Sequence, residues 1–195
     1  MRVHPGIRLI PIALLVVASG AGVPAARAAA DVDADAAGGV PREYQVKAAF
    51  VDRFLNFVEW SGPQAAGDTL VIGVVGDSPL AAALRAVYAG AGAGPVQVRT
   101  AGTPREMAEA CRVIFVSAVI GGAPRADDPQ WGDVAWTASH QVLTIGEDDG
   151  FTASGGVIGF YTEDDRLRFA VSEGASARAG LTIGSKLLRL AKIVP

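Results

Sequence analysis

The chain offers few side chains of the kinds that catalyse reactions. Its two histidines are His4 and His140, its one cysteine is Cys111, and acidic residues form two runs, 147–149 and 163–165. A cysteine beside a histidine can form a nucleophilic pair, and two carboxylates across a cleft can hydrolyse glycosides. Cys111, however, precedes an apolar run, where cysteine commonly serves as a small core residue, and both acidic runs resemble exposed turns. We therefore predict that the protein is not an enzyme.

Motifs for nucleophilic catalysis and for nucleotide binding are missing from the sequence. It contains no G-x-S-x-G turn, no G-x-G-x-x-G fingerprint and no G-x-x-x-x-G-K-[ST] phosphate loop. Residues 70–77, LVIGVVGD, come closest to a nucleotide loop, but they fit a strand that turns into a capped helix. The cysteine and histidine counts are too low for a zinc site built from several such ligands, so we predict no metal and no cofactor.

Apolar periodicity predicts the elements that would position any functional group. Residues 42–60 predict a core helix whose buried stripe is Val46, Phe50, Phe54, Phe57 and Val58. Strands are predicted at 70–75, 96–99, 113–116 and 142–145, a hairpin at 157–162 and 167–171, and helices at 79–89, 104–110 and 131–137. A last helix is predicted with Ile183, Leu187, Leu190 and Val194 on its buried face and Lys186, Arg189 and Lys192 on the opposite face.

This alternation of strands and helices predicts an α/β fold in one domain. We expect a largely parallel sheet flanked by helices on both faces, with an antiparallel hairpin near one edge. Ligands of such sheets bind beyond the carboxyl ends of the strands. The loops at 76–79, 117–124 and 146–150 are therefore the places where a site is expected.

The N-terminal residues predict export. Residues 1–28 combine two early arginines, a short apolar run and a small-x-small site for cleavage between Ala28 and Ala29, as in a secretory signal peptide. Residues 29–41 are small and acidic and predict a flexible leader before the domain at 42–195. Cleavage would remove three arginines and no acid, taking the formal charge from -3 to -6, so nucleic acid is not expected as a partner.

Several blocks of the sequence resemble the YfiR family of periplasmic regulatory proteins. The blocks, in the order of that family, are FVEW at 57–60, LVIGVVGD at 70–77, CRVIFVS at 111–117, VLTIG at 142–146, GGVIGF at 155–160, RF at 168–169 and IGSKLLRLA at 183–191. Together they cover roughly residues 44–191. Their order and spacing carry the resemblance, because no single block is specific.

Because the only cysteine is Cys111, a lipid anchor at the cleavage site is not expected, and the mature protein is expected to be exported and soluble. The resemblance implies a periplasmic protein that represses an inner-membrane, YfiN-like diguanylate cyclase by binding its periplasmic sensor region. Such repression lowers cyclic di-GMP signalling and biofilm formation. The resemblance also implies a homodimer. Cys111 is unpaired, so control by an internal disulfide is excluded, and Ser172 stands where the family resemblance leads us to expect asparagine. The alternative is a periplasmic protein that binds a small ligand and is not coupled to a cyclase.

Six residues are candidates for contacts with a partner or ligand. Asp77 lies in the first of the expected loops, and Arg168 alternates with apolar neighbours, so it is either exposed for a partner or paired with an acid of the hairpin. The aromatic candidates could instead be core residues, since an aromatic side chain at the edge of a core can serve either purpose. The full set is Glu59, Trp60, Asp77, Phe151, Tyr161 and Arg168.

Overall fold

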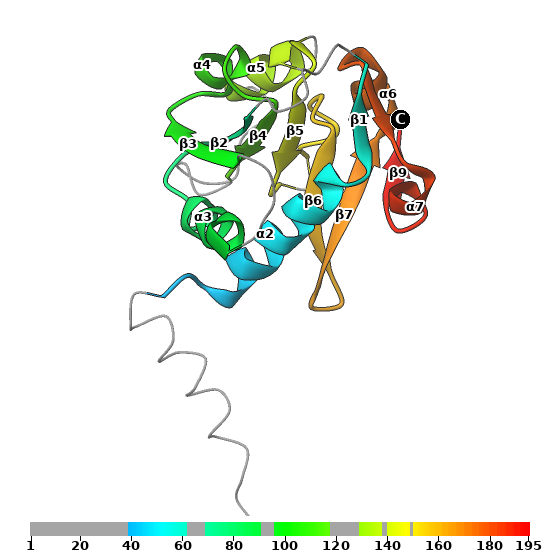
Figure 1. Cartoon of the computed structure of the whole chain (residues 1–195). Helices are drawn as coiled ribbons and strands as arrows, with labels where there is room; N and C mark the ends of the chain where they lie inside the picture. Colours follow the sequence, from blue (N-terminus) through cyan, green and yellow to red (C-terminus); the bar gives the residue numbers. More distant parts are fainter. Residues whose placement is uncertain (1–38, 62–68, 91–95, 118–128, 138–139, 149) are drawn as a thin grey trace, which may run out of the picture. The chain divides into compact units, whose positions relative to one another are not determined.

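The fold is built on a seven-stranded sheet in the order β3-β2-β4-β5-β6-β7-β9 (Figure 1). The computed structural model describes residues 39–61, 69–90, 96–117, 129–137, 140–148 and 150–195. The strands are β1 (Val58–Trp60), β2 (Leu70–Val75), β3 (Val96–Ala101), β4 (Val113–Val116), β5 (Leu143–Gly146), β6 (Ile158–Glu163), β7 (Arg166–Ser172), β8 (Leu181–Ile183) and β9 (Lys192–Val194). The helices are α2 (Arg42–Leu55), α3 (Leu80–Gly90), α4 (Pro104–Ala108), α5 (Pro129–Thr137), α6 (Glu173–Arg178) and α7 (Ser185–Leu188).

Strand pairing in this sheet is parallel except between β6 and β7. These two strands form a hairpin whose turn residues, Asp164 and Asp165, have φ angles of 49° and 55°. A two-residue hairpin turn of this type requires positive φ at both positions, and aspartate tolerates it. The predicted α/β class, with a largely parallel sheet and an antiparallel hairpin near one edge, is confirmed.

Helices cover both faces of the sheet. Phe115 of β4 packs in one core cluster with Phe54 of α2, whereas its chain neighbours Ile114 and Val116 pack in a second cluster with Met107 of α4. Successive side chains of a strand point to opposite faces, so each buried strand contributes to both clusters. Figure 1 shows α2 beside α3 and α4 beside α5, which are the two helical layers.

The order of the first five strands of the sheet is that of flavodoxin-like folds. The chain leaves β2 to form β3 on one side and then crosses to form β4 on the other side. The direction of winding therefore reverses between β2 and β4, and the connecting loops diverge at the carboxyl ends of these strands. Ligands of open α/β sheets bind at such a point.

The predicted first helix is too long. The helix α2 ends at Leu55, and Val58–Trp60 instead form β1, which pairs antiparallel with β8. The periodic aromatic stripe continues past the helix because Phe57 and Val58 still face the core as the backbone becomes extended. Val46 was also predicted in the buried stripe, but it is 40% exposed.

The prediction of one long C-terminal helix is wrong. The segment forms β8, the single turn α7 and β9, and Leu190 of the predicted buried face is 74% exposed. Backbone pairing explains the difference: β8 adds to β1, and β9 adds to the free edge of β7, with Ile193 opposite Val171. These partners lie far away in the sequence, so helical spacing of apolar residues was misleading here.

The helix α6 was not predicted, because its sequence EGASAR lacks apolar periodicity. Ser172 starts it by accepting a hydrogen bond from the backbone N–H of Ala175. The predicted capping box of α4 is confirmed, with Thr103 and Glu106 each accepting from the other's backbone N–H.

Candidate functional site

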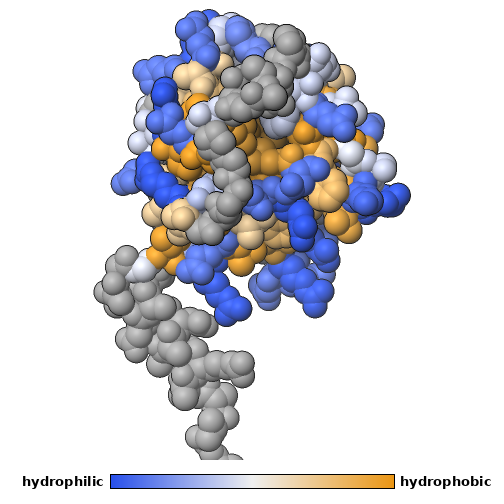
Figure 2. Space-filling model, in the orientation of Figure 1, coloured by the Kyte–Doolittle hydropathy of each residue, from blue (hydrophilic) through white to orange (hydrophobic). Residues whose placement is uncertain are grey.

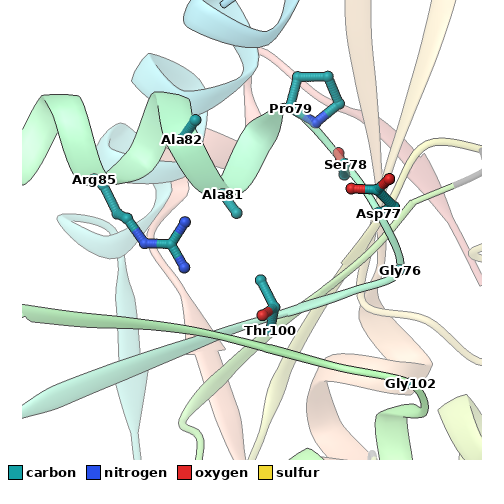
Figure 3. Close-up of a pocket in the computed structure, with 9 residues that line it drawn as sticks. All are labelled: Gly76, Asp77, Ser78, Pro79, Ala81, Ala82, Arg85, Thr100 and Gly102. Carbon is teal, nitrogen blue, oxygen red and sulfur yellow. The ribbon is translucent and has the colours of Figure 1, made fainter.

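A hollow of about 880 Å³ opens at the carboxyl ends of β2 and β3 (Figure 3). The turn after β2, the first turns of α3 and the end of β3 line it, and they contribute the polar side chains of Asp77, Arg85 and Thr100. This is the first of the three loops in which a site was predicted. Asp77 is the one predicted contact residue that lines this hollow.

The turn into the hollow is a strand that becomes a capped helix. Gly76 has a φ of 90°, a conformation that favours glycine. The Ser78 hydroxyl oxygen accepts a hydrogen bond from the N–H of Leu80 (3.3 Å), and the Ser78 carbonyl accepts one from Ala81 (3.2 Å). These bonds occupy N–H groups that a phosphate-binding helix start would present to its ligand.

A buried ion pair lies at the carboxyl end of the neighbouring strands. The Lys47 ammonium of α2 donates to the Glu147 carboxylate at 2.8 Å, and Ser117 donates to the other oxygen of that carboxylate at 2.9 Å. Val116 pairs with Gly146 across β4 and β5, so the residue that follows each strand lies beside the other. The side chains of Lys47 and Glu147 are 6% and 5% exposed.

Proton affinities in this cluster follow from burial and charge. Burial acts most strongly on Lys47 and lowers its pKa, but hydrogen bonds and charges of Glu147 and Glu43 outweigh burial and raise the pKa above its ordinary value. The pKa of Tyr44 is also raised, first by burial and then by the charge of Glu147. The Lys47 ammonium lies 4.8 Å from the centre of the Tyr44 ring. Lysine therefore stays charged in this site.

This geometry corrects the prediction that the run 147–149 is an exposed turn. Glu147 is buried with Lys47, and its run begins directly after a buried strand. The second acidic run behaves as predicted, since residues 163–165 are exposed at the tip of the hairpin. The carboxylate that directly follows a buried strand is therefore buried, whereas the carboxylates in the hairpin turn are exposed.

The predicted contact residues Glu59 and Trp60 lie together on β1. Glu59 is exposed and pairs in register with Thr182, while Trp60 is partly buried against the main core. Among the described residues, none accepts a hydrogen bond from the Trp60 indole N–H, although that nitrogen is buried. Trp60 therefore serves partly as a core residue, the role favoured by its position after an aromatic stripe.

Tyr161 and Arg168 are directly opposite each other on β6 and β7. The Lys192 ammonium lies 5.6 Å from the centre of the Tyr161 ring, and the Arg168 side chain lies 3.9 Å from the Glu163 carboxylate. Arg168 is about half exposed, so both alternatives for it hold: it faces solvent and it pairs with an acid of the hairpin. Five of the six predicted contact residues thus lie on three parts of the fold: the turn after β2, the strand β1 and the β6–β7 hairpin.

Phe151 and Cys111 are both core residues. Phe151 is 1% exposed, with Gly146 and Gly156 directly against its ring, so its side chain offers no surface to a partner in this structure. Cys111 is 3% exposed, and its thiol lies 3.5 Å from the Met107 sulfur. Burial raises the pKa of the Cys111 thiol, which makes it a poor nucleophile, and the 3% exposure of the side chain leaves it inaccessible to a second folded chain.

Sequence reasoning missed Lys47 and Arg85 and misinterpreted Glu147 as part of an exposed turn. Each had a signal: Lys47 lies three residues before Phe50 on α2, Arg85 is the one charged residue of the helix LAAALRAVYAG, and Glu147 directly follows a buried strand. The described residues contain no group of three or more His, Cys, Asp or Glu that could hold a metal ion. The arrangement can bind polar ligands through Asp77 and Arg85.

Comparison with known protein families identifies the family of this chain. A family model described as YfiR/HmsC-like matches residues 44–192. No curated protein matches the chain. None of the helices in the described residues is long and apolar enough to span a membrane.

Two solved structures resemble the fold at 11% sequence identity. One is a conserved domain protein from Vibrio cholerae O1 biovar eltor, with a TM-score of 0.48, covering 78% of this chain and 60% of that chain. The other is an ABC domain in complex with L-Trp from Streptococcus pneumonia, with a TM-score of 0.49, covering 77% of this chain and 60% of that chain. This chain thus spans 60% of the length of each of them.

The fold and the site define an α/β protein of flavodoxin-like strand order with an open hollow at the carboxyl ends of β2 and β3. The chain belongs to the YfiR/HmsC-like family, as the resemblance of its sequence blocks had indicated. At the level of the family, this membership supports a periplasmic regulatory protein of the type that acts on diguanylate cyclases.

Proposed function

We propose that the protein binds the periplasmic sensor region of an inner-membrane diguanylate cyclase and represses it, and so lowers cyclic di-GMP signalling and biofilm formation. The observation that carries this proposal is the family match over residues 44–192. The protein acts by binding and not by catalysis. The signal peptide at 1–28 and the leader at 29–41 are part of the proposal, and of these residues only 39–41 are among those the structure describes.

Exposed residues on β1 and on the β6–β7 hairpin are the candidates for a partner surface. Figure 2 shows hydrophobic residues in the middle of one face, with hydrophilic residues around them. The exposed large hydrophobic residues in the described part of the chain are Val46, Leu190 and Ile193. We propose Glu59, Trp60, Tyr161 and Arg168 as contact residues, since each lies at least partly exposed on the β1 strand or the β6–β7 hairpin.

Cyclic di-GMP in the host is the first measurement. Deletion of the gene should raise cyclic di-GMP and surface attachment, and the wild-type protein should restore both. Arg168→Ala should keep its unfolding midpoint, because the side chain is half exposed, yet fail to restore repression. Arg99→Ala is the matched control, since Arg99 is an exposed arginine on β3, at the opposite edge of the sheet.

Capture of the partner is the second measurement. The tagged protein, crosslinked in cells, should recover a membrane protein with a cyclase domain, and Trp60→Ala and Tyr161→Ala should reduce that recovery. Unchanged cyclic di-GMP in the deletion strain, together with no cyclase recovered, would contradict the repressor role. We also propose a homodimer, which sedimentation of the purified protein tests directly.

A further inference from the structure

Two opposite charges without partners face the same hollow. Figure 3 shows the Arg85 guanidinium and the Asp77 carboxylate extending into one space from opposite sides, with the Thr100 side chain rising between them. Arg85 and Asp77 are both exposed, and among the described residues neither forms an ion pair or a hydrogen bond. The two groups are therefore available to a ligand.

The remaining walls of the hollow leave room between these charges. Gly76 and Gly102 carry no side chain, and Pro79, Ala81 and Ala82 form a short apolar wall. The volume of about 880 Å³ falls in the range of small-molecule sites. The hollow lies beyond the carboxyl ends of β2 and β3, which is the side of an open α/β sheet on which ligands bind, although the reversal of strand order falls between β2 and β4.

The charges of Arg85 and Asp77 determine which kind of ligand fits the hollow. A guanidinium binds a carboxylate through two parallel hydrogen bonds, and a carboxylate accepts hydrogen bonds from an ammonium group. Arg85 would attract a simple anion, but Asp77 would repel it. Asp77 would attract a simple cation, but Arg85 would repel it. Phosphate has a further disadvantage, because the N–H groups of Leu80 and Ala81 are already bonded to Ser78.

We propose that this hollow binds a small zwitterion, with its carboxylate on Arg85 and its ammonium on Asp77. The Thr100 hydroxyl donates to the carboxylate, and the aliphatic part of the ligand lies against Ala81 and Ala82. The site is separate from the proposed contact residues on β1 and the β6–β7 hairpin. It stands whether or not the protein represses a cyclase.

The test uses the purified protein and ligands of graded length. The probes are 4-aminobutyrate, 5-aminopentanoate and 6-aminohexanoate, and the singly charged comparisons are the alkylamine and the alkanoate of each chain length. Calorimetry should give saturable binding for at least one zwitterion and none for its singly charged analogues. A hydroxyalkanoate of the same length distinguishes an ammonium from a hydroxyl as the group that Asp77 recognises, and weaker binding by the hydroxyalkanoate is expected.

Variants assign the binding to these side chains. Arg85→Gln and Asp77→Asn should each raise Kd by about tenfold or more, the usual consequence of losing a hydrogen bond to a charged group. Arg53→Gln, an exposed arginine on α2, should leave Kd unchanged. Both site residues are exposed, so their variants should unfold at the wild-type midpoint.

Three results would overturn the proposal: no binding by any of the zwitterions, equal binding by singly charged analogues, or unchanged Kd in Arg85→Gln. None of these results depends on cyclic di-GMP, because binding is measured on the isolated protein. Failure of the zwitterion site and failure of the repressor role are therefore distinguishable.

Discussion

Lys47 is the residue whose surroundings depart furthest from its type. Its ammonium group is buried on the core side of α2, where Glu147 and Glu43 both accept its hydrogen bonds. Glu147 in turn accepts from Ser117, so α2 is connected to the carboxyl ends of β4 and β5. Desolvation of two charges offsets much of their attraction, and the pair is best understood as fixing the position of α2 on the sheet.

Removing one member of this pair should be costly. We expect Lys47→Met to lower the free energy of unfolding by about 3 kcal/mol, because it removes the Lys47 ammonium from beside the buried Glu147 carboxylate. Urea unfolding followed by tryptophan fluorescence measures the change. Arg53→Met, an exposed change on the same helix, should stay within about 0.5 kcal/mol of wild type.

The double variant Lys47→Met/Glu147→Gln gives a second readout. It should recover part of the stability lost in Lys47→Met, since the buried carboxylate charge is gone. A double variant that is less stable than wild type by the sum of the effects of Lys47→Met and Glu147→Gln, each measured alone, would show that the two side chains are not coupled.

Cys111 should react with thiol reagents only when the protein unfolds. Its side chain is buried beside Met107, and burial raises its pKa, so little thiolate is accessible at neutral pH. An aromatic disulfide reagent should modify the native protein at the rate of unfolding and the urea-denatured protein at once. Rapid modification of the native protein at pH 7 would contradict this placement of Cys111.

At the scale of elements, the turn after β5 is held by one aromatic ring. Phe151 folds back so that its ring lies against Gly146 at the end of β5 and Gly156 before β6. A Cβ at either glycine would approach the ring to less than 3.0 Å. The two glycines are therefore needed for close approach, and the connection from β5 to β6 is packed around a core side chain.

Gly146→Ala and Gly156→Ala should each destabilise the protein by about 1–3 kcal/mol, the usual cost of overpacking a core. Thermal unfolding measures the effect. Gly102→Ala is the matched control, because its nearest neighbour for a Cβ is the Glu106 carboxylate at 3.7 Å, an ordinary contact. Equal midpoints for all three variants would mean that Phe151 can move aside without loss.

At the scale of the whole molecule, several groups hold their protons more tightly when the chain is folded. The pKa values of Tyr44, Tyr88 and Cys111 are raised mainly by burial, and that of Lys47 is raised by its carboxylate partners, which outweigh burial. The folded state therefore binds more protons than the unfolded state in alkali. By linkage, stability from these groups is complete below their unfolded pKa values and is lost as pH rises through the folded ones.

We therefore expect the free energy of unfolding to fall steadily as pH rises above about 8.5, the ordinary pKa of a thiol, and more steeply above about 10, where tyrosine and lysine titrate. Urea unfolding at a series of pH values measures this slope. Tyr88→Phe should flatten it, because the carboxylate of Asp52 adds to burial in raising the pKa of Tyr88. An unchanged slope in Tyr88→Phe would show that Tyr88 does not contribute to the loss of stability at alkaline pH.

Six of the seven strands of the central sheet, including those of the hairpin, and the helices α3, α4 and α5 could be predicted from the sequence, whereas β9 could not. These elements carry their own local signals: continuous apolar runs for β2, β4 and β5, the Thr103 capping box for α4 and a pair of aspartates at the hairpin turn. The order of the sequence blocks also identified the family. Each of these signals lies within a few consecutive residues, so it predicts its element without knowledge of the tertiary structure.

The secondary structure of the C-terminal segment and the positions of the candidate sites depend on tertiary contacts. Apolar residues at 183–194 have helical spacing, yet pairing with β1 and β7 makes most of that segment extended, because those strand edges offer backbone partners that a local pattern does not reveal. The joining of Lys47 to Glu147 spans 100 residues, and the Asp77–Arg85 hollow requires β3 beside β2. Ion pairs and strand pairing join residues that are distant in the sequence, so the tertiary structure determines which groups come into contact.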